Sequence, residues 1–134
     1  MHALRAAEVG VLVLSTMHIS STDKVLERLL SFAPEDSESH LRTLLAETLN
    51  AVVHQELVPT VDGNKRAACE TLVATTAVRQ VLRQHQAFHL RNILSTGKQH
   101  GMQTMKQSLD QLRQEQVIDD GVYNLVLEYY EGQR

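Results

Sequence analysis

Apolar and polar positions along the chain predict a mixed α/β fold in which helices surround a short β-hairpin. The continuous apolar run Val11–Leu14 is typical of a central parallel strand that is covered on both faces. Residues 51–59 and 65–73 alternate between apolar and polar positions, which predicts two strands. Asp62-Gly63 between them is a strong turn signal, so we expect these two strands to form a hairpin.

Helical spacing of apolar residues covers most of the remaining chain. The first residues resemble the last turns of a helix that stops at Gly10, so we expect a further segment upstream. The next predicted helix follows candidate N-caps at 19–23 and ends at Pro34. Further helices are predicted over 38–49, 76–85, 88–95, 104–116 and 119–130. Gly97 fits a helix C-terminal cap, and Thr104 with Gln107 resembles a capping box. We predict a strand-containing part over 1–74 and an all-helical part over 75–134.

Composition narrows the class of protein. The chain has 134 residues, of which 43% are hydrophobic and 22% charged, as in an ordinary soluble globular domain. A net charge of -3 without a dense Lys/Arg stripe argues against a nucleic-acid surface. The longest apolar run is far too short to cross a membrane. The single cysteine, Cys69, excludes an intramolecular disulfide and a four-cysteine zinc site, which suits a reducing cytoplasm.

His18 is the first candidate functional residue. It follows the predicted strand and precedes a predicted helix, and ligands of open α/β sheets bind beyond the carboxyl ends of strands. The free N–H groups at the start of that helix would favour a phosphate or a carboxylate there. A histidine in this place could donate a hydrogen bond to a phosphate oxygen. The alternative is a turn histidine bonded to the backbone.

Two arginines four residues apart form the second candidate. Arg79 and Arg83 share one face of a predicted helix, with Val78, Val81 and Leu82 largely on the other side. They could dock an acidic partner or a neighbouring subunit, or they could form a solvated basic face.

The remaining reactive residues favour structural roles. His85 and His89 have a spacing that could bind a metal on one helix, but we predict a helix break between them, no third ligand and hence no metal site. Cys69 is expected to be a small buried hydrophobe, Met102 and Met105 to fill the core, and Tyr129 and Tyr130 to pack at the end of the last helix. The sequence has no G-x-x-x-x-G-K-[ST] phosphate loop and no G-x-S-x-G elbow.

Three segments together resemble one family. The stretch ALRAAEVGVLVLSTMHISS is similar to the histidine box of the secretion-type hexameric ATPases. The stretch AVRQVLR resembles the A-I-R-N-L-I-R motif of the type IV pilus retraction (twitching-motility, PilT-like) branch, and TGKQHGMQTM resembles its closing T-G-x-x-x-G-M-Q-T motif. The single cysteine argues against the extension-type branch, which usually carries a four-cysteine zinc site. The departures from the family's pattern, such as Ile19 in the histidine box, leave an accessory retraction-type paralogue open.

The resemblance implies a fold and a function. It implies the C-terminal part of an ATPase domain: a partial RecA-like P-loop NTPase domain with few strands and one hairpin, followed by an all-helical C-terminal subdomain. The family works as a ring of six subunits that uses ATP and Mg²⁺ to power pilus retraction. It acts in the cytoplasm, peripheral to the inner membrane, with an inner-membrane platform protein as partner and without inserting into the membrane or binding nucleic acid.

The resemblance also assigns roles to residues. His18 matches the histidine associated with the γ-phosphate position. The residues that match the retraction motif, which we interpret as coupling or docking residues, are Ala77, Val78, Arg79, Gln80, Val81, Leu82 and Arg83. Because the phosphate loop is absent, we expect no catalytic residue, no bound cofactor and no ATP hydrolysis in this chain by itself. The alternatives are a free-standing module that joins or caps rings of a full-length ATPase, and a small unrelated enzyme that uses His18 or Cys69.

Overall fold

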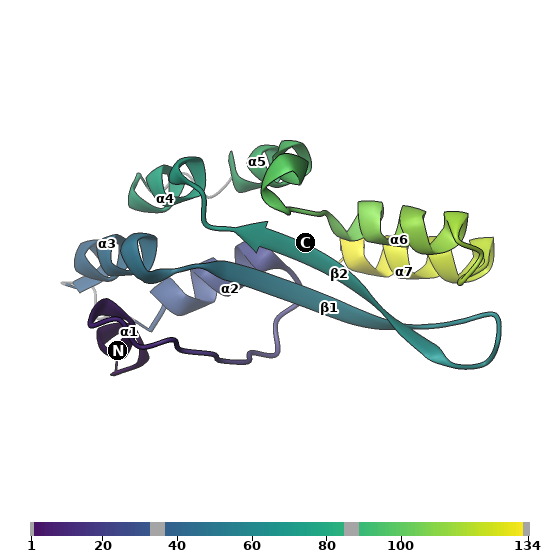
Figure 1. Cartoon of the computed structure of the whole chain (residues 1–134), viewed down its shortest axis with the longest axis horizontal. Coiled ribbons are helices and arrows are strands. Elements are labelled where there is room, and N and C mark those ends of the chain that lie inside the picture. Colours follow the sequence, from purple (N-terminus) through teal and green to yellow (C-terminus); the bar gives the residue numbers. More distant parts are fainter. Residues whose placement is uncertain (1, 33–36, 85–88, 133–134) are drawn as a thin grey trace.

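The computed structural model describes residues 2–32, 37–84 and 89–132 as helices around one long hairpin. Its elements are α1 (His2–Glu8), α2 (Thr22–Leu30), α3 (Glu38–Thr48), β1 (Ala51–Pro59), β2 (Lys65–Val73), α4 (Thr76–Arg83), α5 (Leu90–Thr96), the 3₁₀ helix η3 (Gly97–His100), α6 (Met105–Gln114) and α7 (Asp120–Gly132). The hairpin runs along the molecule, with α1, α3 and α4 near one end and α6 and α7 at the other (Figure 1).

The hairpin has the bounds that alternation predicts. β1 and β2 pair antiparallel, with His54 opposite Glu70 in the register. The turn is closed by the N–H of Thr60, which donates to the carbonyl of Asn64, and by the N–H of Gly63, which donates to the carbonyl of Thr60. Gly63 has φ +82°, a left-handed conformation that glycine adopts without strain. The predicted hairpin is therefore confirmed.

The two faces of the hairpin differ in burial. Successive side chains of a strand point to opposite faces. One face, which we call the inner face, carries the buried residues His54, Val58, Ala68, Glu70 and Leu72. The other face carries Val53 and Leu57, which are 59% and 61% exposed. Among the described residues, the buried side chains of the hairpin therefore lie on its inner face.

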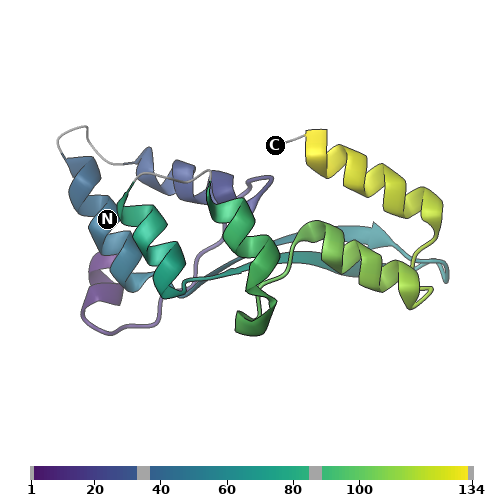
Figure 2. The same ribbon diagram turned by 90° about the horizontal axis from the view of Figure 1, so that it is seen from above.

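Two hydrophobic clusters cover the inner face. We call the first the proximal cluster; its buried members are Leu26, Leu45, Ala46, Leu72, Val78, Val81, Leu82, Leu90, Leu94 and Met102. We call the second the distal cluster; its buried members are Val58, Ala68, Met105, Leu109, Leu112, Ile118, Tyr123 and Tyr130. Figure 2 shows α6 and α7 together at the distal end, away from α3 and α4.

Several helices begin or end at the capping residues that the sequence predicts. Gly10, with φ +91°, ends α1, because its N–H and that of Val11 donate to the carbonyls of Ala7 and Ala6 in a Schellman arrangement. Thr104 and Gln107 form both bonds of a capping box at the start of α6. Gly97 is the C-cap of α5. Pro34, His85 and the first residue of the helix predicted over 88–95 lie outside the described residues.

The strand predicted over Val11–Leu14 is wrong. Residues 11–19 have no regular secondary structure. Val11, Leu12 and Leu14 are 54%, 75% and 88% exposed. A strand requires a neighbour that satisfies its N–H and C=O groups, and the sheet of the described residues contains β1 and β2 as its two strands, without 11–14. His18 therefore lies in an irregular segment and not at the end of a strand.

Packing predictions for single residues have mixed outcomes. Met102 and Met105 are buried, as expected of core residues. Tyr130 is buried and stacks on His54 at 5.5 Å between ring centroids, but Tyr129 is 58% exposed, so its predicted packing is wrong. Cys69 is only partly buried, because its place in β2 opposite Gln55 puts it on the outer face. Within the described ranges, the helices are all too short or too polar to cross a bilayer.

Candidate functional site

His18 is exposed and lies in the segment that leads into α2. Ser21 is the N-cap of α2 and is completely buried, so the end of this segment is anchored while His18 faces solvent. An exposed imidazole in this position can donate a hydrogen bond to an incoming anion. We call residues 11–20 the His18 segment.

The start of α2 does not present all its N–H groups to a ligand. The N–H and the hydroxyl of Thr22 both donate to Oε1 of Glu70, at 3.4 and 2.7 Å. The expectation that this helix directs its free N–H groups at a phosphate is therefore wrong for its first residue. A carboxylate of the protein already occupies part of the positive end of the helix.

Glu70 was missed by the sequence analysis. It is fully buried, and its other carboxylate oxygen accepts a bond from the N–H of Met105, the first residue of α6, at 3.4 Å. A signal for it exists in the sequence. Ala68, Glu70 and Leu72 occupy alternate positions of β2, and an acidic residue at an inward-facing position of such a pattern indicates a buried carboxylate with specific partners.

The retraction-motif residues form α4, which begins at a local cap. The side chain of Thr75 accepts a bond from the N–H of Val78 at 3.5 Å. Val78, Val81 and Leu82 are buried in the proximal cluster, as the spacing predicts. Three of the seven motif residues therefore fix α4 to the core, and a docking role remains open only for the others.

Arg79 binds the C-terminal end of α3. Its Nη1 donates to the carbonyl oxygens of Ala46 and Glu47 at 2.5 and 3.0 Å. These carbonyls lie in the last turn of α3, where acceptors have no partner within the helix and a positive charge is favourable. The side chain is partly buried. Arg79 therefore positions α4 against α3.

Arg83 faces the same end of α3 but is held less tightly. Its Nη2 lies 3.8 Å from Oε1 of Glu47, and the two side chains are 47% and 56% exposed. An exposed ion pair at this distance contributes at most about 1 kcal/mol. Arg83 is thus the motif cation that a partner could recruit at small cost.

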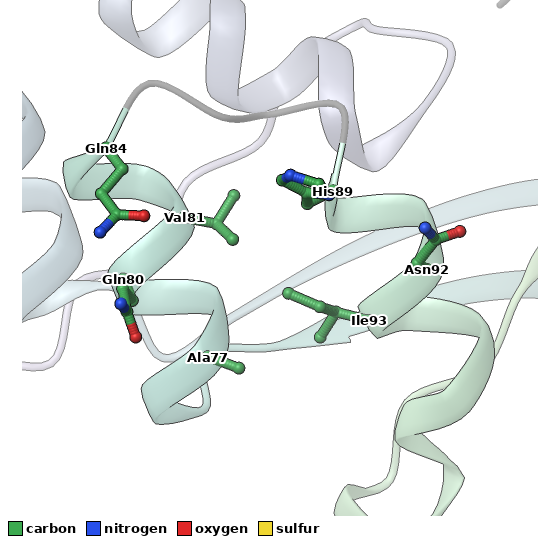
Figure 3. A pocket seen from close by; sticks show the side chains of 7 residues that line it. All are labelled: Ala77, Gln80, Val81, Gln84, His89, Asn92 and Ile93. Atoms are coloured by element: carbon green, nitrogen blue, oxygen red, sulfur yellow. The ribbon is translucent and has the colours of Figure 1, made fainter.

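The opposite side of α4 borders a pocket shared with α5. Its volume is about 290 Å³, and its lining residues are Ala77, Gln80, Val81, Gln84, His89, Asn92 and Ile93. Figure 3 shows Ala77 and Val81 of α4 pointing across this space toward the side where His89 and Ile93 lie. Gln80, an exposed motif residue, therefore lies at the rim of a hollow whose polar groups are mainly side-chain amides.

The segment Thr96–Met105 joins the two clusters. A Cβ built on Gly97 would lie 2.3 Å from the sulfur of Met102, so the close packing of η3 requires glycine there. Gln103 exchanges two backbone bonds with Thr71 at 2.8 and 3.1 Å, and Thr104 then caps α6. The segment thus has a defined structural role as the connection from α5 to α6.

Metal binding finds no support in the described residues. No group of three or more His, Cys, Asp or Glu side chains among them could hold a metal ion. His89 borders the pocket described above, and His85, its partner in the H-x-x-x-H spacing, lies outside the described part of the chain.

Two regions with perturbed pKa values serve the scaffold. Bonds from Thr60 and then Asn64 lower the pKa of Asp62 in the hairpin turn to about 2. On α6, the Lys106 side chain and the Tyr123 hydroxyl lower the pKa of Asp110. Arg113 stacks over Tyr123 at 4.2 Å, so this network fixes α7 against α6.

The profile of the "Type II/IV secretion system protein" family matches residues 1–126. The chain is 40% identical over 117 residues to the "Twitching motility protein" of Neisseria gonorrhoeae, a match that covers 87% of this chain and 31% of the relative. It is 34% identical over 107 residues to the "Type IV pilus retractation ATPase PilT" of Pseudomonas aeruginosa, covering 80% of this chain and 31% of the relative. The chain thus spans about a third of these relatives.

Solved structures agree with the sequence matches. The pilus retraction motor PilT with bound ADP superposes with a TM-score of 0.81 at 28% identity, over 91% of this chain and 34% of that one. The ATPase DotB of Legionella pneumophila superposes with a TM-score of 0.79 at 26% identity, over 93% of this chain and 34% of that one. The predicted fold class and the resemblance to pilus retraction ATPases are both confirmed. The chain belongs to the type II/IV secretion system protein family.

Proposed function

We propose that this chain is the C-terminal part of a motor ATPase that powers type IV pilus retraction and hence twitching motility. The observation that carries the proposal is the agreement with the pilus retraction motor over 91% of the chain, at a TM-score of 0.81. The 40% identity to a twitching motility protein points to the same branch. In this proposal the motor is a homo-oligomeric ring, with six subunits as in the family that the sequence resembles. It works at the cytoplasmic face of the inner membrane, where it contacts a platform protein.

Nucleotide is the proposed cofactor of the complete motor, as ATP with Mg²⁺. The related motor was solved with ADP, and the exposed His18 is free to donate a bond to a γ-phosphate oxygen. A donor that contacts ATP but not ADP binds the two nucleotides differently, and that difference biases the conformation of the subunit. The chain contains no phosphate loop, which would supply the anion cradle and its lysine, so by itself it does not hydrolyse ATP.

A chimera tests the motor function. The part of this chain that matches the gonococcal twitching motility protein over 117 residues replaces the corresponding segment of that protein, and twitching is scored in cells that lack the native protein. We expect the chimera to restore twitching and His18→Ala to abolish it, with both proteins assembled to the same extent. A chimera that assembles into rings but does not support twitching, or one that is unaffected by His18→Ala, would contradict the proposal.

Calorimetry tests the activity of the chain by itself. We expect no binding of Mg²⁺–ATP and no turnover, because the charge-stabilising groups of phosphoryl transfer are missing. Micromolar binding that is lost in His18→Ala would mean that this chain builds a nucleotide site without a phosphate loop. The proposed inactivity would then be wrong.

The alternative function is a module that joins or caps rings of a full-length ATPase. The exposed outer-face residues Val53 and Leu57 favour it, because uncovered apolar residues on a sheet often mark an interface. Size-exclusion chromatography with the full-length relative discriminates the two functions. Incorporation of this chain into rings of the relative would favour the module.

A further inference from the structure

A polar pair lies between the two hydrophobic clusters on the inner face of the hairpin. Along β2, Leu72 belongs to the proximal cluster and Ala68 to the distal cluster, and Glu70 lies between them. Its cross-strand neighbour is His54, which is also buried. An apolar residue at position 70 would join the two clusters without any desolvation cost. A buried carboxylate in this place therefore needs a specific explanation.

The contacts of Glu70 connect two helix N-termini. Oε1 accepts the hydroxyl of Thr22 at 2.7 Å and its N–H at 3.4 Å, and Oε2 accepts the N–H of Met105 at 3.4 Å. Thr22 is the first residue of α2 and Met105 the first residue of α6. The positive ends of two helices that are far apart in sequence thus share one carboxylate. A displacement of either helix start changes the energy of the other through this group.

Each helix start is continuous with a segment of functional interest. The His18 segment leads directly into the buried Ser21 and Thr22. The start of α6 is fixed to β2 by the backbone bonds between Gln103 and Thr71 and by the bond from the N–H of Cys69 to the hydroxyl of Ser108. Motion of the His18 segment can therefore reach α6 through Thr22 and Glu70, while β2 remains the common support.

We propose that Glu70 is a positioning residue that couples the His18 segment to α6 and, through it, to α7. The coupling itself is a property of the chain without nucleotide. Its use in the motor rests on the proposed function, in which His18 responds to the γ-phosphate. Each carboxylate oxygen of Glu70 accepts hydrogen bonds from the start of one helix. Glu70→Gln replaces one of these oxygens by an NH₂ group, which donates, and so breaks the link to one of the two helix starts.

The test is a transmission experiment by NMR on the full 134-residue chain without nucleotide. Thr104→Ala removes the side chain that caps α6, and the backbone amide signals of His18 and Thr22 are the readout. We expect Thr104→Ala to shift these signals in the Glu70 background and to lose this effect in the Glu70→Gln background. Lys106→Ala is the matched control, since this exposed residue of α6 bonds to Asp110 and should not shift the signal of Thr22.

A second pair of variants keeps the test decisive if Glu70→Gln does not fold. Thr22→Val removes the hydroxyl donor with little change of shape, and Thr22→Ser retains it. Transmission from Thr104→Ala to the His18 amide should be weaker in Thr22→Val, which keeps only the bond from its N–H to Glu70, than in Thr22→Ser. Equal transmission in both variants, transmission that persists in Glu70→Gln, or no shift in the unmodified background would overturn the coupling.

The outcome is separable from that of the chimera. If the chimera fails while transmission through Glu70 is observed, the coupling stands and only its use for nucleotide sensing is wrong. If the chimera supports twitching while transmission is absent, the motor function stands and Glu70 has no coupling role.

Discussion

The proximal and distal ends of the hairpin are built differently. At the proximal end, α2, α3, α4 and α5 contribute to one cluster with Leu72, and Arg79 ties α4 to the end of α3. At the distal end, α6, α7 and Ile118 between them form a cluster with Val58 and Ala68, and side-chain bonds around Asp110 and Tyr123 hold the two helices together. The residues that match the retraction motif thus lie at the proximal end, whereas at the distal end α7 packs against α6 and holds it in place. Four of the seven residues that match the retraction motif, Val78, Arg79, Val81 and Leu82, thus hold α4 in the scaffold.

The largest expected effects come from the two cluster centres. Leu45→Ala in the proximal cluster and Leu109→Ala in the distal cluster should each lower the free energy of unfolding by roughly 2–5 kcal/mol, because both side chains are almost completely buried. Because β1 and β2 support both ends, we expect one transition in urea, followed by circular dichroism. Leu125→Ala, at a residue that is 69% exposed, is the control and should change the value by less than about 0.5 kcal/mol. Two separate transitions would show that the ends are independent.

The next effect concerns the close approach at η3. Gly97→Ala places a Cβ against the buried side chain of Met102 and should destabilise the chain by roughly 1–3 kcal/mol. Gly132→Ala, where nothing lies within 4 Å, should change stability by less than about 0.5 kcal/mol. Thermal unfolding of the two variants measures the difference. Equal melting temperatures would mean that Met102 moves aside without cost.

The two motif arginines should differ in the same assay. Arg79→Ala removes the donors to two carbonyls of α3 and should cost about 1–2 kcal/mol, whereas Arg83→Ala should cost less than about 1 kcal/mol. Adding Glu47→Ala should abolish the effect of Arg83→Ala but not that of Arg79→Ala, because Arg79 binds backbone oxygens. If both effects vanish in the Glu47→Ala background, the assigned role of Arg79 is wrong.

The smallest effect is a pH dependence at the distal tip of the hairpin. The pKa of Asp62 is lowered from 3.8 to about 2, mainly by the bond from Thr60. The charged form therefore stabilises the turn above about pH 4, and this contribution is lost as pH falls toward about 2. Melting temperatures measured between pH 5 and pH 2 should fall less for Asp62→Asn than for the unmodified chain. Parallel curves would exclude the turn as a contributor.

Short-range signals account for the parts of the fold that sequence predicts well. The bounds of β1 and β2 follow from alternation around Asp62-Gly63, and the start of α6 follows from Thr104 and Gln107. These patterns depend on neighbours a few residues away, so they can be recognised without knowing the rest of the fold. The apolar run Val11–Leu14 predicts a strand by the same kind of local pattern. A strand also needs a neighbouring strand to pair with, however, and a local pattern does not show whether one is present.

The candidate site is predicted only in part, for a related reason. The sequence identifies His18 and the motif helix as segments of interest, and it separates Val78 and Leu82 from the arginines by spacing. It does not reveal that Arg79 binds carbonyls of α3, 32 and 33 residues away, because any helix end could supply such acceptors. Glu70 is missed for the same reason, since its partners are 48 and 35 residues distant.

Those separations also bear on the order in which the chain folds. The hairpin turn and the capping box join residues that are close in sequence, so they can form early. The contacts of Glu70 instead require Thr22 and Met105 to reach it across long loops, whose closure costs conformational entropy. Glu70 should therefore become satisfied late, on the native side of the transition state. Replacing it should mainly speed unfolding and leave the folding rate almost unchanged, so the residue protects the assembled chain kinetically.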